Sequence, residues 1–164
     1  MKTKTSNGLD SLLEIMDKLL GEDGCPWDKE QTHESLRDNL LEECHETIEA
    51  IDNKDMTSLK EELGDVLLQV VFHAKLAEKA QAFTIDDVVA TISNKLITRH
   101  THVFGDEKAT TAEDALQIWK ANKQKEQKLW KIWCILRKIV NLSDFLSIIA
   151  ENSLTNVNYQ FITM

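Results

Sequence analysis

Two neighbouring segments of the sequence repeat the same spacing of acidic residues. The first reads EECHE over residues 42–46, and the second reads EELGD over residues 61–65. In each segment the second acid and the last acid are three residues apart, which places them on one face of a helix. These pairs are Glu43 with Glu46 and Glu62 with Asp65. If the two segments form adjacent antiparallel helices, two acids from each helix meet at the edge of the core.

Such a group of carboxylates needs a positive partner. Two carboxylates about 5 to 6 Å apart repel each other by roughly 3 kcal/mol at an effective dielectric constant near 20. Asp and Glu oxygens are the ligands that Mg²⁺ or Mn²⁺ prefers, and Mg²⁺ completes its shell with water and substrate phosphate. Gly64 lies between two of the acids. Because a glycine costs a helix about 1 kcal/mol, it indicates a close helix approach or room for a ligand.

Two other interpretations of the acids stay open. Glutamate-rich helices are often simply solvated faces, although two matched copies on adjacent helices favour a site. Glu42 and His45 also form the ExxH pair that di-iron helical bundles use. A di-iron site needs a second ExxH pair on a matching helix. His73 does not provide one, because the position three residues before it is Val70 and not a Glu.

Basic and aromatic residues recur at four-residue spacing further along the chain. Lys95 and Arg99 share one helix face, and Trp119 and Lys123 share a face of the next helix. Cations of this kind bind phosphates, and a Trp ring can stack against a nucleobase. Each pair alone is ordinary. Together with the acids they indicate a triphosphate ligand, because a metal ion neutralises only part of its charge.

The elements that must position these residues are helical. Apolar residues at helical spacing predict five helices, over residues 9–20, 32–53, about 58–77, 84–99 and 111–128. Their starts are marked by capping signals at Thr32, at Ser58 with Glu61, at Thr84 with Asp87 and at Thr111 with Asp114. The short connection over residues 53–56 requires the second and third helices to be antiparallel neighbours. Residues 21–31 and 100–110 are predicted loops, so His100 and His102 are interpreted as loop residues.

The composition bounds the fold and the class of ligand. One Pro and five Gly among 164 residues leave few turns for a sandwich or barrel, so we expect an all-α helical bundle of about five helices. The net charge of -9 has the wrong sign for a nucleic-acid partner. Three cysteines without a CxxC pair indicate free thiols, with Cys44 in the core. With no secretion signal and no clean apolar span, we expect a soluble cytoplasmic protein without a membrane partner.

The composition changes after Lys128. Only 5 of the 36 residues from 129 to 164 are charged, against 42 of the first 128. We therefore predict one domain over residues 1–128 and a separate tail over residues 129–164. Our hypothesis for the tail is a shifted reading frame or a truncation near residue 128. The alternative is a native basic amphipathic helix that docks on a membrane surface or a partner.

Several separated motifs together resemble the MazG family of nucleoside triphosphate pyrophosphohydrolases. In order, within residues 9–128, they are GCPWDKEQTHESLRDNLLEECHETIEAI, EELGDVLLQVVFHAKLAE, NKLITRHTHVFGD and IWKANKQKEQK. The resemblance implies an all-α fold, a homodimer and Mg²⁺-dependent cleavage of an NTP or dNTP to the monophosphate and pyrophosphate. Many members carry two such repeats, and this chain carries one that resembles the amino-terminal repeat.

The resemblance also implies a role for individual residues. The metal carboxylates correspond to Glu43, Glu46, Glu62 and Asp65. Glu42 and Glu61 hold the adjoining acid positions, from which one orients or deprotonates the attacking water. The nucleotide-contacting positions are Lys95, Arg99, Trp119 and Lys123, with Asn39 and Lys60 as additional candidates.

Two functions stay open at this point. The first is a working pyrophosphohydrolase in which a dimer completes the site from this single repeat. The second is an inactive or regulatory remnant of a two-repeat protein, which folds and dimerises without turnover. Release of monophosphate and pyrophosphate distinguishes them.

Overall fold

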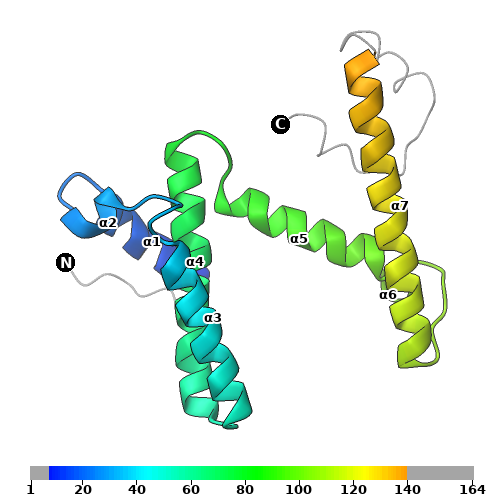
Figure 1. The fold of residues 1–164 in the computed structure, drawn as a ribbon, viewed down its shortest axis with the longest axis horizontal. Coiled ribbons are helices and arrows are strands. Elements are labelled where there is room, and N and C mark those ends of the chain that lie inside the picture. The colour runs from blue at the N-terminus through cyan, green and yellow to red at the C-terminus, as the bar shows by residue number, and fades with distance from the viewer. Residues whose placement is uncertain (1–7, 140–164) are drawn as a thin grey trace. The chain divides into compact units, whose positions relative to one another are not determined.

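The computed structural model describes residues 8–139, and this part of the chain is helical without strands (Figure 1). Its helices are α1 (Leu9–Leu20), α2 (Pro26–Glu30), α3 (Arg37–Asp52), α4 (Met56–Lys79), α5 (Ile85–Arg99), α6 (Thr101–Phe104) and α7 (Ala112–Ile139). The predicted all-α fold is confirmed. The five long helices correspond to the five expected ones, and the short helices α2 and α6 lie in the two segments predicted as loops. The chain divides into two compact units at Ser93 and Asn94.

The helices α3 and α4 form the hairpin that carries the acidic segments. They lie side by side and run in opposite directions, as the short connection requires (Figure 1). Lys54 takes a left-handed backbone conformation with φ of 56° in this turn. The hairpin brings the two acidic segments next to each other.

The start of α4 differs from the predicted capping box. The Asp55 carboxylate accepts hydrogen bonds from the backbone N–H groups of Thr57 and Ser58, at 2.9 and 3.2 Å. Ser58 therefore lies within the first turn, and its hydroxyl donates to Asp55 at 2.9 Å. The prediction of Ser58 as the cap was wrong, because Asp55 satisfies two free amides of the first turn by itself.

The start of α3 is also later than predicted. Thr32 and Ser35 form a single turn that two hydrogen bonds between them hold closed. The Ser35 N–H donates to Thr32 Oγ1 at 3.1 Å, and the Thr32 N–H donates to Ser35 Oγ at 2.9 Å. Leu36 follows this turn and is buried. The caps of α5 and α7 agree with prediction, since Thr84 pairs with Asp87 and Thr111 with Asp114.

The core of the first unit joins α1 and α4 to the segment before α3. Met16, Leu36, Val71 and Phe72 form a buried cluster, on which the flanking leucines of α1 and α4 pack. The Lys75 ammonium pairs with Asp17 on α1 at 2.7 Å and with Glu78 at 3.0 Å. The cluster therefore anchors the carboxyl-terminal half of α4, and it does not include the acidic segments of α3 and α4.

In the second unit, α6 is attached to α7 by polar contacts. The buried Asn122 side chain donates to the Thr101 hydroxyl at 2.9 Å and accepts from the Lys125 ammonium at 3.2 Å. α7 runs to Ile139 and does not end near Lys128 as predicted. The predicted domain boundary at residue 128 therefore falls inside a helix, and the rest of the tail beyond residue 139 lies outside the described residues. Within the described chain, no helix is long and apolar enough to cross a membrane.

Candidate functional site

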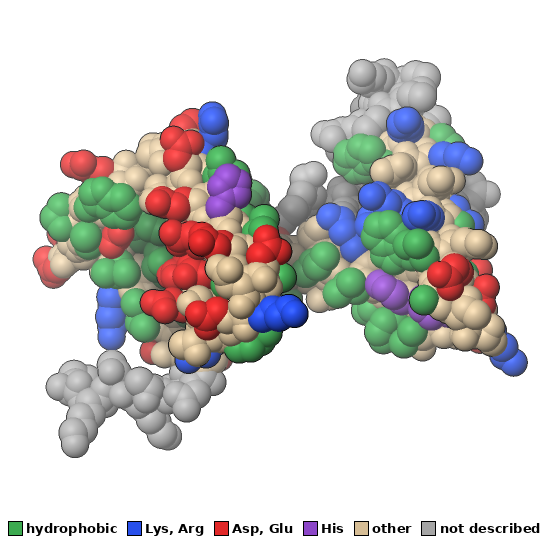
Figure 2. All heavy atoms as spheres, turned by 60° about the horizontal axis from the view of Figure 1, so that its bottom comes forward, with side chains coloured by type: hydrophobic (Ala, Val, Ile, Leu, Met, Phe, Trp, Pro, Cys, Tyr) green, Lys and Arg blue, Asp and Glu red, His purple; other side chains and the backbone are tan. Residues whose placement is uncertain are grey.

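Three of the predicted metal carboxylates converge on one point of the hairpin. Glu43 from α3 and Glu62 and Asp65 from α4 each offer an oxygen, and these oxygens lie within 4.8 Å of one another. Figure 2 shows acidic side chains gathered on one face of the unit that contains this hairpin. The fourth predicted ligand, Glu46, lies near enough to act electrostatically on Glu43 and Glu62 but does not belong to the converging group.

Two of the converging acids, Glu43 and Glu62, resist ionisation. Partial loss of hydration raises the pKa of Glu43 above its usual value of 4.5, and neighbouring acids raise it further, in the order Asp65, Glu46 and Glu42. Loss of hydration likewise raises the pKa of Glu62, followed by repulsion from Glu46, Asp65, Glu61 and Glu43. A bound cation would reverse this balance, because it favours the charged form of each carboxylate.

The donor set fits a hard divalent cation. All three converging groups are carboxylates, and oxygen ligands of this kind suit Mg²⁺ and Mn²⁺. His45 is exposed and does not join this group of carboxylates. Glu42 and Glu61 are exposed beside the cluster and act on it as negative charges. Their assignment to the attacking water stays a prediction.

Gly64 lies on α4 between the converging acids. A Cβ atom added there would meet nothing within 4 Å. The expected close helix approach is therefore absent from the described chain, and the space beside this glycine is open. Room for a ligand or for another chain is the remaining interpretation.

A second group of predicted residues assembles in the unit that begins at Asn94. The Arg99 guanidinium carbon lies 5.2 Å from the centre of the Trp119 ring, and the Lys123 ammonium lies 5.1 Å from it. Cations at this distance are attracted by the negative face of the indole. Arg99, Trp119 and Lys123 thus come together across α5 and α7, while Lys95 is exposed on α5.

Glu126 is a member of this group that sequence reasoning missed. Arg99 donates to one oxygen of Glu126 from Nε and Nη2, at 3.0 and 2.8 Å, and the Thr98 hydroxyl donates to the other at 2.8 Å. The pair is partly buried, with side-chain exposures of 16% and 34%. Spacing along the chain gives no signal for this contact, because 27 residues separate the partners.

The remaining predicted contacts lie with the acids in the first unit. Asn39 is half-buried on α3, and Lys60 is exposed on α4. The structure also shows an unpredicted pair, in which His33 and His73 approach to 2.8 Å between their Nδ1 atoms and stack in parallel. Cys25 and Cys44 are free thiols, and both are half-buried. The side chain of Cys134 lies outside the described residues.

Comparison with known proteins identifies the family. A family model described as the MazG nucleotide pyrophosphohydrolase domain matches residues 31–104. The nucleoside triphosphate pyrophosphohydrolase/pyrophosphatase MazG of Thermotoga maritima is 61% identical over 97 residues, which are 59% of this chain and 38% of that protein. The nucleoside triphosphate pyrophosphohydrolase of Escherichia coli K12 is 44% identical over 122 residues, which are 74% of this chain and 46% of that protein. The chain therefore spans less than half the length of these relatives.

The fold resembles that of a solved structure. The crystal structure of a mazG-related protein from Thermotoga maritima superposes with a TM-score of 0.60 at 30% sequence identity, and it covers 71% of this chain and 99% of that one. The family match includes the converging acids Glu43, Glu62 and Asp65 as well as Arg99. The chain belongs to the MazG nucleotide pyrophosphohydrolase family.

Proposed function

We propose that this chain is a Mg²⁺-dependent nucleoside triphosphate pyrophosphohydrolase, for which Mn²⁺ can replace Mg²⁺. Its substrates would be NTPs or dNTPs, and its products the monophosphate and pyrophosphate. The observation that carries the proposal is the convergence of three carboxylate oxygens within 4.8 Å on the α3–α4 hairpin. The relatives printed as nucleoside triphosphate pyrophosphohydrolases support the same activity.

The acids would divide the chemistry between them. Glu43, Glu62 and Asp65 would hold the metal ion, with Glu46 as a further ligand from α3. The ion supplies Lewis-acid polarisation of the phosphate oxygens and lowers the pKa of a bound water. Glu42 or Glu61 would orient the attacking water and take its proton. Water oxygen bonds to the α-phosphorus as the bond to the bridging oxygen breaks, which releases pyrophosphate.

The basic group would bind the phosphate chain. Arg99 and Lys123 carry positive charge beside Trp119, and Lys95 lies exposed on α5. Such cations stabilise the negative charge that develops on a pyrophosphate leaving group. Asn39 and Lys60, on the α3–α4 hairpin, would also contact the nucleotide.

A homodimer is part of the proposal. The hairpin exposes large apolar side chains that a single copy leaves uncovered, namely Leu41, Ile48, Ile51, Leu63, Leu67 and Val70, each between 39% and 57% exposed. Burying such surface is favourable by about 25 cal/mol per Å². We infer that a second copy covers it in a cytoplasmic protein.

An inactive or regulatory remnant is the competing function, because the chain spans only 38% and 46% of the two curated relatives. Purified protein incubated with a panel of NTPs and dNTPs, with Mg²⁺ or with EDTA, distinguishes the two. Mg²⁺-dependent release of monophosphate and pyrophosphate supports the enzyme. A folded dimer without turnover supports the remnant, and diphosphate plus phosphate as products contradicts the proposed reaction.

The site assignment has its own test. Glu43→Gln keeps the side-chain volume but removes a ligand charge, so we expect turnover to be lost while the circular dichroism spectrum is unchanged. Glu14→Gln on α1 is the matched control, because Glu14 is exposed and lies outside the cluster. Undiminished turnover in Glu43→Gln would refute the assignment.

A further inference from the structure

The pair of His33 and His73 joins two segments of the first unit that are 40 residues apart in the chain. His33 is exposed in the turn before α3, and His73 is half-buried on α4. Their Nδ1 atoms lie 2.8 Å apart, while the ring centres lie 5.1 Å apart and the ring planes differ by 8°. The two rings therefore meet through their Nδ1 atoms. Neither residue belongs to the group of converging carboxylates.

The contact between these two nitrogens needs one proton and one lone pair. A neutral imidazole carries a hydrogen on one ring nitrogen and a lone pair on the other, so one Nδ1 donates and the other accepts. A single added proton leaves the contact intact, because the charged ring donates to the neutral ring in a charge-assisted hydrogen bond. With a second proton, both Nδ1 atoms carry a hydrogen, neither can accept, and two positive rings face each other. The contact therefore survives one added proton and is lost with two.

The surroundings of His73 favour its neutral form. Burial lowers the pKa of His73 below its usual 6.5, and the charge of His33 lowers it further, while no carboxylate of the described chain adds to this balance. Glu34 is exposed beside His33, and hydrogen bonds within its own turn, followed by the charges of His33 and Arg37, hold its pKa below 4.5. The charged groups that pair with one another where α1 packs on α4 are Asp17, Lys75 and Glu78. The second proton therefore goes to a half-buried ring that has no carboxylate partner.

The pair is the polar link between α4 and the turn of residues 32–36. Among the hydrogen bonds of the described residues, it is the one that joins this turn to α4. The side chains of the turn otherwise bond within their own segment. Leu36 is the apolar link, because it is buried in the core cluster together with residues of α4. Loss of the pair would leave the turn attached through Leu36, which favours local opening over unfolding of the whole unit.

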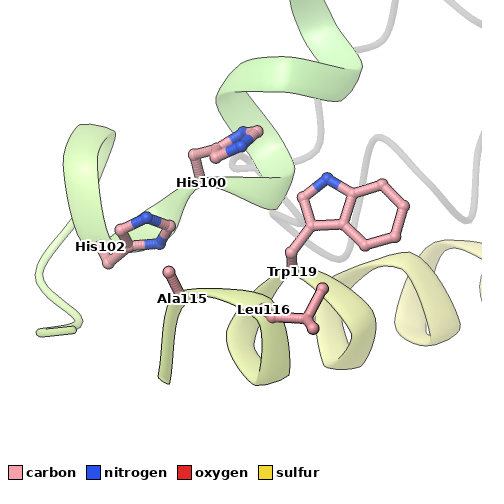
Figure 3. Close-up of a pocket in the computed structure, with 5 residues that line it drawn as sticks. All are labelled: His100, His102, Ala115, Leu116 and Trp119. Carbon is pink, nitrogen blue, oxygen red and sulfur yellow. The ribbon is translucent and has the colours of Figure 1, made fainter. Parts of the chain in front are cut away.

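A second pair of neighbouring histidines in the described chain responds differently to a proton. His100 and His102 line a pocket in the unit that begins at Asn94, together with Ala115, Leu116 and Trp119 (Figure 3). Sequence analysis placed both histidines in a loop, whereas His102 lies on α6. Their rings are tilted by 51°, and the Nδ1 atom of His100 lies 2.6 Å from the Leu96 carbonyl, which can only accept. This contact keeps its donor in either charge state of His100, so protonation does not break it.

We propose that the His33–His73 pair is a proton-operated latch on the turn before α3. The latch holds this turn on α4 while the pair carries at most one added proton, and it releases the turn when both rings are charged. This response to acid is separate from the proposed reaction, because neither ring belongs to the acidic cluster or to the basic group around Trp119.

Hydrogen exchange of the turn tests the latch. Mass spectrometry of the full chain would give protection factors for residues 33–37 at pH 7.5 and pH 5.0, as exchange rates divided by the intrinsic rates at each pH. His33→Asn places an amide group where the Nδ1 atom lies, so it keeps a hydrogen bond to His73 but takes no charge. His33→Phe removes the bond at both pH values. His45→Gln is the control, because His45 is an exposed histidine of the same unit and lies outside the pair.

We expect the protection of the turn in the parent protein to fall by about fivefold or more between the two pH values, as for the loss of one hydrogen bond. His33→Asn should lose less than about twofold, because its amide stays neutral. His33→Phe should be weakly protected at both pH values, and His45→Gln should follow the parent protein.

Unchanged protection in the parent protein would overturn the inference, as would a loss in His33→Asn equal to that of the parent protein. The core residues Val71 and Phe72 should stay better protected than the turn at pH 5.0. Equal protection of the turn and of these core residues would mean that the whole unit opens, which also contradicts a local latch.

Discussion

Glu43→Gln should change the stability of the protein in opposite directions with and without a divalent cation. In the absence of metal, Glu43 and Asp65 place ligand oxygens within 4.8 Å of each other. At that distance two charges repel by about 0.9 kcal/mol in the dielectric of water and about 3.5 kcal/mol at an effective dielectric of 20. Because these side chains are partly exposed, screening brings the repulsion close to the lower figure. Removing one charge should therefore stabilise the metal-free protein by about 1 kcal/mol, or about 3 to 6 °C in Tm.

With metal present, the parent protein should be more stable than Glu43→Gln. A ligand at a hundred times its Kd stabilises the native state by about 2.7 kcal/mol, and the parent protein should gain this from Mg²⁺. The variant has lost one of three converging carboxylates and should gain much less. We therefore expect the variant to melt above the parent protein in EDTA and below it in saturating Mg²⁺.

Thermal unfolding followed by circular dichroism at low ionic strength is the assay. Low salt is needed because salt weakens the repulsion between exposed charges, with a screening length of roughly 10 Å at about 0.1 M. Glu14→Gln should leave Tm unchanged in both buffers. A Glu43→Gln protein that is less stable than the parent in EDTA would show that the carboxylate is structural, and equal Mg²⁺ gains in both proteins would show that Glu43 is not a ligand.

Three further outcomes concern the scaffold. The Thr84 amide and hydroxyl hold the pKa of Asp87 below its usual 3.8. The ionised Asp87 should therefore stabilise the native state above pH 3.8, and this contribution should disappear as the pH falls through the lowered pKa. An acid titration of Asp87→Asn should lack this loss of stability. Burial, and then His33, lower the pKa of His73 below its usual 6.5, so stability should be full above pH 6.5 and fall on further acidification. Urea unfolding at pH 7.5 and 5.5 should show a smaller loss in His73→Phe, and an equal loss would contradict this cause. Leu36→Ala should cost about 2 to 5 kcal/mol in urea unfolding, because Leu36 is only 1% exposed in the core; a cost below 1 kcal/mol would show that the segment before α3 is not anchored there.

The sequence predicted the long helices because periodic apolar residues and caps coincide in them. The sequence-based prediction failed at the start of α4, where two polar residues compete for the same backbone N–H groups. Ser58 with Glu61 matches a capping pattern, but Asp55 lies one turn earlier and takes the free N–H groups. The helices α2 and α6 span only five and four residues, which is too short for a periodic signal.

The meeting of the two acidic segments was predictable because it depends on local features of the sequence. The three-residue spacing of the acids depends only on the helix, and the short connection fixes which helices meet. Which oxygens converge depends on the register of α3 against α4, and this is why Glu46 stays outside a group that includes Glu43. Glu126 and the His100–His102 pocket depend on contacts between distant segments, for which one sequence carries no pattern.

The length of α7 has a consequence for whatever sequence follows residue 128. Helices are costly to nucleate but cheap to propagate, so a segment joined in phase to a formed helix adopts its conformation with little demand on its own composition. Residues 129–139 continue α7 in this way, although their composition differs from that of the preceding turns. They extend the rod by about 16 Å at 1.5 Å per residue. The direction of residues 129–139 is thus set by the preceding turns of α7 and not by their own composition.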